Sequence, residues 1–141
     1  MRSKFPVTVH IFLFREEKVL LLRRFNTGYE DGNYSVPAGH VEQGETITQA
    51  AIREVKEEIG VEVQPADLQV VGVIQRKSND ERVDFFLTAS KWTGEPANLE
   101  KDKSDELIWS HLDKLPVNTI PYIKRAIKNF LDSVWFEEFG W

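Results

Sequence analysis

Residues 39–61 read GHVEQGETITQAAIREVKEEIGV, and the fold expected for this chain follows from this stretch. Within it, single glycines, single glutamates, an Arg-Glu pair and a Glu-Glu pair stand at fixed distances from one another. These positions are Gly39, Glu45, Arg53, Glu54, Val55, Glu57, Glu58, Gly60 and Val61. So many specified positions in one short stretch make a chance arrangement improbable.

The middle of this stretch is predicted to form a helix. Thr46 is followed three positions later by Gln49, which is the capping-box pattern of a helix N-terminus. Gly60 marks the expected C-terminal end. Apolar side chains at four-residue steps predict one buried stripe, formed by Ile47, Ala51, Val55 and Ile59.

Three acidic residues of this helix share a neighbouring face. Glu54 and Glu58 are four residues apart, and Glu57 is three residues from Glu54, so their carboxylates project to one side. Such carboxylates repel each other and lower helix stability by roughly a few tenths of a kcal/mol per pair. Folding does not require that arrangement, whereas Mg²⁺ does, because it prefers oxygen ligands and is shared between carboxylates and substrate phosphates. The alternative is a solvated acidic surface, which the nine residues at fixed spacing make improbable.

The whole stretch resembles the Nudix box, the signature of the Nudix hydrolases (MutT-type pyrophosphohydrolases). That signature is written G-x5-E-x7-R-E-U-x-E-E-x-G-U, with U aliphatic, and this chain matches it without departure. The resemblance implies a Mg²⁺ site, in which Mn²⁺ can substitute, with Glu54 and Glu58 as principal ligands. It implies that Glu57 is a further ligand or base and that the Gly39 carbonyl completes the site. Glu45 is implied to be part of the supporting shell.

Arg53 lies beside these carboxylates and can hold them through bidentate hydrogen bonds. We therefore expect Arg53 to support the catalytic carboxylates and not to clamp a phosphate. A second acidic candidate lies in residues 95–100, EPANLE, which resembles a segment of nucleotide-diphosphatase members of the family. There Glu100 would be a base or metal ligand, and the alternative is a polar loop.

The remaining elements are predicted to form an α+β domain. Strands are expected at 7–14 and 18–25 as a hairpin, at 68–74 and 83–89 around a polar turn, and at 106–110. A second helix is expected at 118–131. The order of elements suits helices covering a mixed sheet, and the family resemblance sharpens this to the Nudix fold, a mixed β-sheet sandwiched between α-helices.

Candidate substrate-binding residues outside the box rest on weaker signals. Arg23 and Arg24 end the second expected strand, where either could face a phosphate or base, or simply form a charged strand end. His40 adjoins Gly39 and could reach the phosphates or face solvent. Arg82 and Asp84 alternate with apolar residues on one expected strand, for which surface alternation is the favoured interpretation.

Two aromatic features indicate packing, within the chain or between subunits. Trp109 resembles a residue of the family's late strand. The tail 135–141, WFEEFGW, carries four aromatic residues, too many for an ordinary frayed terminus. It docks either on this chain's own sheet, which is the preferred prediction, or on a second subunit, which would make a homodimer.

Composition narrows the class of protein. At 141 residues, with 41% hydrophobic and 29% charged residues, the chain is expected to be one globular domain, residues 1–141. The absence of cysteine excludes disulfides and thiolate metal sites. No apolar run approaches the ~20 residues of a membrane-spanning helix, and no targeting segment is recognised, so a cytoplasmic location is the default expectation. The net charge of −5 argues against sequence-independent nucleic-acid binding.

The sequence therefore predicts a Mg²⁺-dependent pyrophosphohydrolase acting on a nucleoside diphosphate derivative. Nucleoside or deoxynucleoside triphosphates, cleaved to a monophosphate and pyrophosphate, are the preferred substrates. ADP-ribose, other nucleotide sugars, dinucleoside polyphosphates and RNA 5′ ends are alternatives within this class. Outside it, the alternatives are a non-catalytic module that senses a nucleotide and an interaction module built around the aromatic tail.

Overall fold

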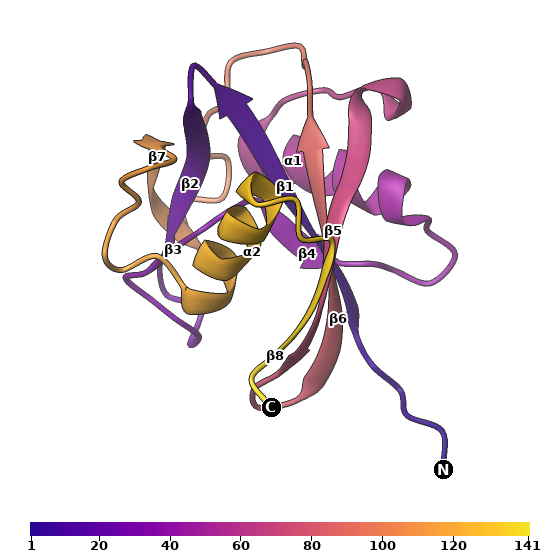
Figure 1. Ribbon diagram of the computed structural model, residues 1–141. Coiled ribbons are helices and arrows are strands. Elements are labelled where there is room, and N and C mark those ends of the chain that lie inside the picture. Colours follow the sequence, from indigo (N-terminus) through magenta and orange to yellow (C-terminus); the bar gives the residue numbers. More distant parts are fainter.

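The computed structural model describes residues 1–141, and Figure 1 shows two helices on opposite faces of one mixed sheet. Its elements, in chain order, are β1 (Val7–Arg15), β2 (Lys18–Arg24), β3 (Tyr34–Ser35), β4 (Ala38–His40), α1 (Ile47–Ile59), the 3-10 helix η1 (Pro65–Asp67), β5 (Leu68–Lys77), β6 (Glu81–Ala89), β7 (Ser104–His111), α2 (Pro121–Leu131) and β8 (Phe136–Phe139). All strands and both helices expected from the sequence are present. The short elements β3, β4, η1 and β8 are additional.

The strands form an eight-stranded sheet with the order β3-β2-β1-β6-β5-β8, in which β4 also pairs with β1 and β7 with β2. The predicted β1–β2 hairpin is confirmed, but the two strands pair only at Phe14↔Val19 and Arg15↔Lys18. Over most of its length β1 instead runs parallel to β6, and at residues 8–10 it also pairs antiparallel with β4. The predicted α+β architecture with a mixed sheet is therefore confirmed.

Side chains of β1 alternate between two hydrophobic cores. Val9, Ile11 and Leu13 join the core beneath α1. Phe12 joins the core beneath α2. The polar residues Thr8 and His10 fall on the same side of the strand as Phe12, where they begin the wall of a cleft.

Helix α1 begins and ends where its sequence predicts. The Thr46 hydroxyl accepts a hydrogen bond from the Gln49 amide at 3.0 Å, and the Gln49 side chain accepts one from the Thr46 amide at 2.9 Å. Gly60 ends the helix in the left-handed conformation, with φ of 74°, which glycine adopts without a steric penalty. The buried stripe is confirmed at Ala51, Val55 and Ile59, and Ile47 is partly buried against it.

The ends of β5 and β6 and the turn between them, residues 75–82, form a projection that we call the arm. In Figure 1 the arm extends below the two helices, with β8 and the C-terminus beside it. Strand β8 runs parallel to β5, from Val73↔Phe136 to Arg76↔Phe139. The aromatic tail thus packs on its own sheet, as preferred from the sequence.

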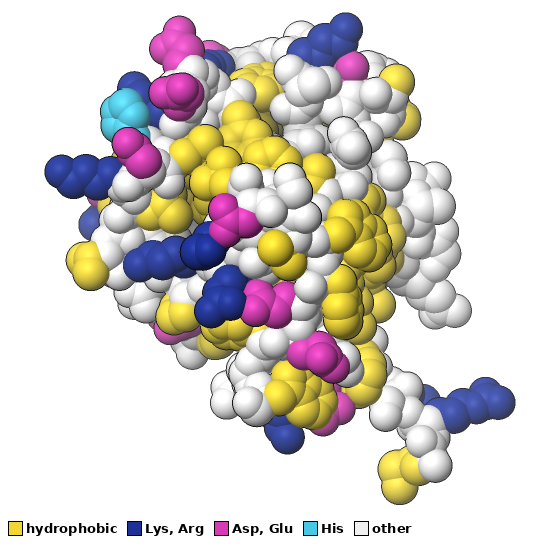
Figure 2. Space-filling model, in the orientation of Figure 1, with side chains coloured by type: hydrophobic (Ala, Val, Ile, Leu, Met, Phe, Trp, Pro, Cys, Tyr) yellow, Lys and Arg dark blue, Asp and Glu magenta, His cyan; other side chains and the backbone are white.

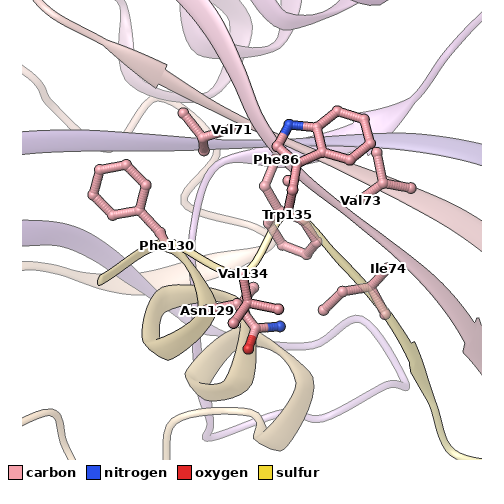
Figure 3. A pocket seen from close by; sticks show the side chains of 10 residues that line it. Val71, Val73, Ile74, Phe86, Asn129, Phe130, Val134 and Trp135 are labelled. Carbon is pink, nitrogen blue, oxygen red and sulfur yellow. The ribbon is translucent and has the colours of Figure 1, made fainter. Parts of the chain in front are cut away.

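The start of the tail covers a small apolar crevice between α2 and β5. Figure 3 shows Trp135 and Val134 of the tail among the side chains that line it, together with Phe86 and Val73. Its volume is about 10 Å³, which is at the lower limit for one water molecule. The crevice therefore has no room for a substrate.

Neither helix has the length and apolar character needed to cross a membrane.

Candidate active site

A cleft of about 730 Å³ lies where the ends of several strands meet the box helix α1. It is lined by Thr8, His10, Arg24, Tyr29, Ala38, Gly39, His40, Glu42, Arg53, Glu54, Glu57, Glu58, Arg76, Ser78, Asn79, Asp80, Arg82, Glu100, Lys103 and Tyr122. Most acidic residues come from the side formed by α1, β4 and the Glu100 loop, and Asp80 comes from the arm. Basic and aromatic residues come largely from the arm, β2, its following loop and α2. Because β1 lies between β4 and β6, these two regions are separated by its width.

On the acidic side, the carboxylate of Glu54 lies directly against the backbone of Gly39. A Cβ at position 39 would be 2.1 Å from the Glu54 Cδ atom, so any other residue would displace the carboxylate. The Glu58 carboxylate accepts a hydrogen bond from the Ala38 amide at 3.0 Å. Strand β4, which the sequence did not reveal, therefore positions both glutamates.

Arg53 connects the supporting residues of the box. Its guanidinium donates two hydrogen bonds to Glu45, at 2.6 and 3.0 Å, and one to Glu54 at 2.6 Å. It also donates to the His40 carbonyl at 2.9 Å. The hydrogen bond from Arg53 lowers the pKa of Glu45 to about 2. Arg53 thus joins Glu45, Glu54 and the backbone of β4 in one hydrogen-bond network.

Negative charge accumulates at Glu54 and Glu58. Burial raises the pKa of Glu54, although Arg53 partly opposes this shift. Burial, followed by the neighbouring Glu54 carboxylate, raises the pKa of Glu58 well above its ordinary value. Glu57 is exposed at the rim of the same cleft. Two crowded carboxylates with too little positive charge beside them are suited to a hard divalent cation.

The oxygen donors present fit Mg²⁺ as part of a shared coordination shell. No three acidic or histidine side chains converge closely enough to form a complete cation site by themselves. Mg²⁺ ordinarily keeps several waters and takes one or two carboxylates together with substrate phosphates. Glu54, Glu58 and the adjacent Gly39 backbone meet that smaller requirement.

The loop containing Glu100 folds over the C-terminal end of α1. The Ala97 amide donates to the Ile59 carbonyl and the Leu99 amide to the Glu58 carbonyl, each at 3.0 Å. The Glu100 amide then donates to the Asn98 side chain at 3.1 Å. These bonds place Glu100 in the cleft, where its charge contributes to the raised pKa of Glu58.

On the opposite side, a buried ion pair joins β5 to β6. The Arg76 guanidinium donates to Asp84 at 2.6 Å and lies 3.6 Å from the centre of the Tyr122 ring. Thr8 also donates a hydrogen bond to Asp84. Asp84 is fully buried, so the surface position favoured from the sequence is wrong. The alternation of residues along a strand predicts on which face of the sheet Asp84 lies. It does not predict that Arg76 is buried on the same face and compensates the charge of Asp84.

His10 lies in the floor between the two sides. It is 2% exposed, its Nε2 atom is 2.9 Å from the Tyr122 hydroxyl, and its Nδ1 atom has no hydrogen-bond partner. Burial lowers the pKa of His10 to about 4. The sequence interpretation missed His10, Arg76 and Tyr122 as cleft residues. A polar residue within the apolar run of β1 was the one signal available for His10.

The two arginines that end β2 separate in the structure. Arg24 lines the cleft and donates to the Tyr29 backbone carbonyl at 2.7 Å. Its guanidinium lies 5.3 Å from the centre of the Tyr29 side-chain ring. Arg23 lies outside the cleft and forms two hydrogen bonds with Asp105, at 2.8 and 3.3 Å. Arg23 is therefore a charged strand end, and its proposed contact with substrate is corrected. His40 is exposed and lines the cleft.

Sequence comparisons identify relatives over most of the chain. The family model described as NUDIX domain matches residues 4–132. The NAD-capped RNA hydrolase NudC of Pseudomonas aeruginosa is 36% identical over 86% of this chain, which spans 41% of the NudC length. The 8-oxo-dGTP diphosphatase of Escherichia coli is 25% identical over 87% of this chain and 96% of its own length.

Solved structures have the same fold. A MutT NUDIX hydrolase from Burkholderia pseudomallei superposes with a TM-score of 0.82 at 25% identity, covering 89% of this chain and 98% of that protein. A MutT protein from Methanosarcina mazei gives a TM-score of 0.80 at 18% identity, covering 94% and 96%. The box, the fold and the family match agree, and the chain belongs to the Nudix hydrolase family.

Proposed function

We propose that this chain hydrolyses a phosphoanhydride bond in a nucleoside diphosphate derivative. The observation that carries the proposal is the placement of Glu54 and Glu58 against the Gly39 backbone, in a cleft whose other side is basic and aromatic. Nucleoside and deoxynucleoside triphosphates are the preferred substrates, with a monophosphate and pyrophosphate as products. The diphosphatase activity named for the E. coli relative supports this preference.

Glu54, Glu58 and the Gly39 carbonyl are the groups that would hold Mg²⁺, with Glu57 as a further ligand at the rim. When bound, Mg²⁺ neutralises phosphate oxygens and lowers the pKa of a coordinated water. The protein's own contribution begins with Arg53, whose hydrogen bonds to Glu54 and Glu45 keep the carboxylates in orientation.

Glu100 is the proposed base. In the reaction, water attacks phosphorus, the anhydride P–O bond breaks, and the proton from water passes to a carboxylate. Glu100 can accept that proton because its loop is bonded to the end of α1 beside Glu58. Arg24 and Lys103 line the same cleft and supply positive charge for phosphate oxygens. Tyr29 and Tyr122 provide aromatic surface for the nucleoside.

A second candidate substrate is a dinucleotide such as the cap of an NAD-capped RNA. The 36% identity with NudC supports it, and so does the extension of the cleft beyond the carboxylate side to the arm, where Ser78, Asn79 and Arg82 line it. ADP-ribose belongs to the same chemical class. An ADP-ribose pyrophosphatase from Methanocaldococcus jannaschii is 36% identical over 54% of this chain.

The experiment is a substrate panel with Mg²⁺, comprising the nucleoside triphosphates, ADP-ribose, a dinucleoside polyphosphate and NAD-capped RNA. Release of phosphate or pyrophosphate and the identity of the nucleotide product are measured. We expect turnover of at least one compound, abolished by chelator and restored by Mg²⁺ or Mn²⁺. Binding without turnover across the panel would instead support a nucleotide-sensing module.

A further inference from the structure

The tail, residues 133–141, lies outside the 4–132 segment matched by the family model. It nevertheless forms strand β8 and continues to Gly140 and Trp141 at the end of the arm. The arm contributes one wall of the cleft, through Arg76, Ser78, Asn79, Asp80 and Arg82. The tail thus pairs directly with the strand that carries one wall of the cleft.

The arm depends on a third strand. Without β8, residues 75–82 would be the end of a two-stranded ribbon, which is only marginally stable in water. Strand β8 adds pairing at Gln75↔Glu138 and Arg76↔Phe139, next to the arginine that faces the cleft. Figure 2 shows the arm as a lower lobe set apart from the body.

The last two residues fit closely onto the arm. A Cβ at Gly140 would be 2.1 Å from the Lys77 carbonyl oxygen, and Gly140 has φ of 95°. This position therefore requires glycine both for space and for backbone conformation. The Trp141 indole N–H donates to the Gln75 carbonyl at 3.5 Å, and the Lys77 ammonium lies 4.9 Å from its ring centre.

The other end of the tail is attached to the body. Glu137 accepts hydrogen bonds from Arg125 at 2.6 Å and from Asn129 at 2.8 Å, both on α2. Trp135 covers the apolar crevice between α2 and β5 (Figure 3). The tail is therefore a brace that runs from α2 and the crevice to the end of the arm.

We propose that residues 133–141 are a positioning element for the substrate. By bracing the arm, they hold the cleft wall that contains the Arg76–Asp84 and Arg82–Asp80 pairs at a set distance from the carboxylate side, and so determine affinity for the part of the substrate that contacts this wall. The inference rests on the proposed function. It predicts an effect on KM, because the tail has no contact with Glu54, Glu58 or Glu100.

The test uses the chain shortened after Asp132 together with Trp141→Ala and Gly140→Ala. Amide hydrogen exchange at residues 75–82 should accelerate at least about tenfold, whereas exchange in α1 should stay unchanged. With the best substrate of the panel, KM should rise at least about fivefold and kcat should stay within about twofold of the full chain. The two point variants keep the test decisive if the shortened chain does not fold.

Two matched variants separate bracing from general packing. Trp135→Ala removes an indole of similar exposure, 57% against 62% for Trp141, from the body end of the tail, where Glu137 also holds the tail, and should accelerate exchange at residues 75–82 less than Trp141→Ala does. Trp141→Phe keeps an aromatic ring over Lys77 and should restore most of the affinity lost in Trp141→Ala.

Unchanged exchange in the arm and unchanged KM in Trp141→Ala and Gly140→Ala would overturn the inference. A loss confined to kcat would overturn it as well, since the tail would then act on the carboxylate side. Failure of the full chain to hydrolyse any compound would contradict the proposed function instead. The hydrogen exchange would still decide whether the tail braces the arm.

Discussion

The carboxylate of Glu54 occupies the space where the side chain of any residue other than glycine at position 39 would begin, 2.1 Å from the Cβ position. Glycine at position 39 therefore lets the Glu54 carboxylate keep its position against the backbone of β4. Gly39→Ala should lower turnover at least ~10²-fold by displacing Glu54. Gly72→Ala is the matched control, because its Cβ would make an ordinary contact of 3.6 Å with the Trp135 carbonyl. Equal turnover of Gly39→Ala and wild type would contradict the proposed role of this contact.

Glu58→Gln should reduce turnover at least ~10²-fold with the fold intact, because it removes charge at the metal site with little change in volume. The same change relieves the burial of a charge beside Glu54. The thermal midpoint in metal-free buffer should therefore rise, and the further increase on adding Mg²⁺ should be smaller than in wild type. Glu57→Gln should lower turnover by a similar factor. Wild-type turnover of both variants at saturating Mg²⁺, or a full rate in excess EDTA, would refute the metal assignment.

Arg53 should act through the carboxylates and not through substrate. Arg53→Lys keeps the charge but loses the forked hydrogen bonds to Glu45, so the Mg²⁺ concentration for half-maximal activity should rise about tenfold. Arg53→Ala should show a larger rise together with reduced kcat. Titration of activity with Mg²⁺ measures both. A rise in KM for the nucleotide, with metal affinity and kcat unchanged, would place Arg53 on the substrate.

Glu100→Gln should lower kcat about 10- to 10²-fold, because the amide cannot accept the proton from water. Nucleotide affinity, measured by calorimetry with a non-hydrolysable analogue, should change less than about threefold. Glu95→Gln is the control in the same loop, since Glu95 is exposed and bonded to Arg15 outside the cleft. Normal turnover of Glu100→Gln would leave Glu57 or Glu54 as the better candidate for the base.

His10 predicts an acid-sensitive fold. Its pKa is lowered from 6.5 to about 4 by burial, so the unfolded chain binds a proton more readily than the folded one between these values. The contribution of the neutral imidazole to the free energy of unfolding is fully present above pH 6.5. It is lost as the pH falls through 4, and the loss is about 3 kcal/mol. Urea unfolding of wild type and His10→Phe at pH 7 and pH 4 measures this. The pH dependence should be smaller in His10→Phe, and identical pH dependence would exclude His10 as its source.

The sequence predicted the parts of the site that are local in the chain. Helix α1 could be predicted because its cap, stripe and carboxylates lie within one short segment and obey helical spacing. The fold of the loop over α1 also agrees with the interpretation of Glu100, although its catalytic role is still a prediction. The sequence could not tell which of the adjacent residues Arg23 and Arg24 lines the cleft. They differ in their partners in the fold, which are Asp105 for Arg23 and the Tyr29 carbonyl for Arg24.

The basic side of the cleft could not be predicted, because tertiary pairing assembles it. Thr8 meets Asp84 only because β1 and β6 run parallel across 76 positions of sequence. Tyr122 meets His10 only because α2 packs over that face. Strand β8 was missed because it covers only four residues, FEEF, in which apolar and polar residues do not alternate, so the pattern does not distinguish a strand from a docked terminus.

The two hydrogen bonds from the Ala97 and Leu99 amides fix the Glu100 loop to the C-terminal end of α1, on one side of the cleft. Lifting this loop would leave the Ile59 and Glu58 carbonyls unpaired at the end of α1, with a net loss of about 1 kcal/mol for each bond. Glu100 therefore moves as one body with the helix that carries Glu54 and Glu58.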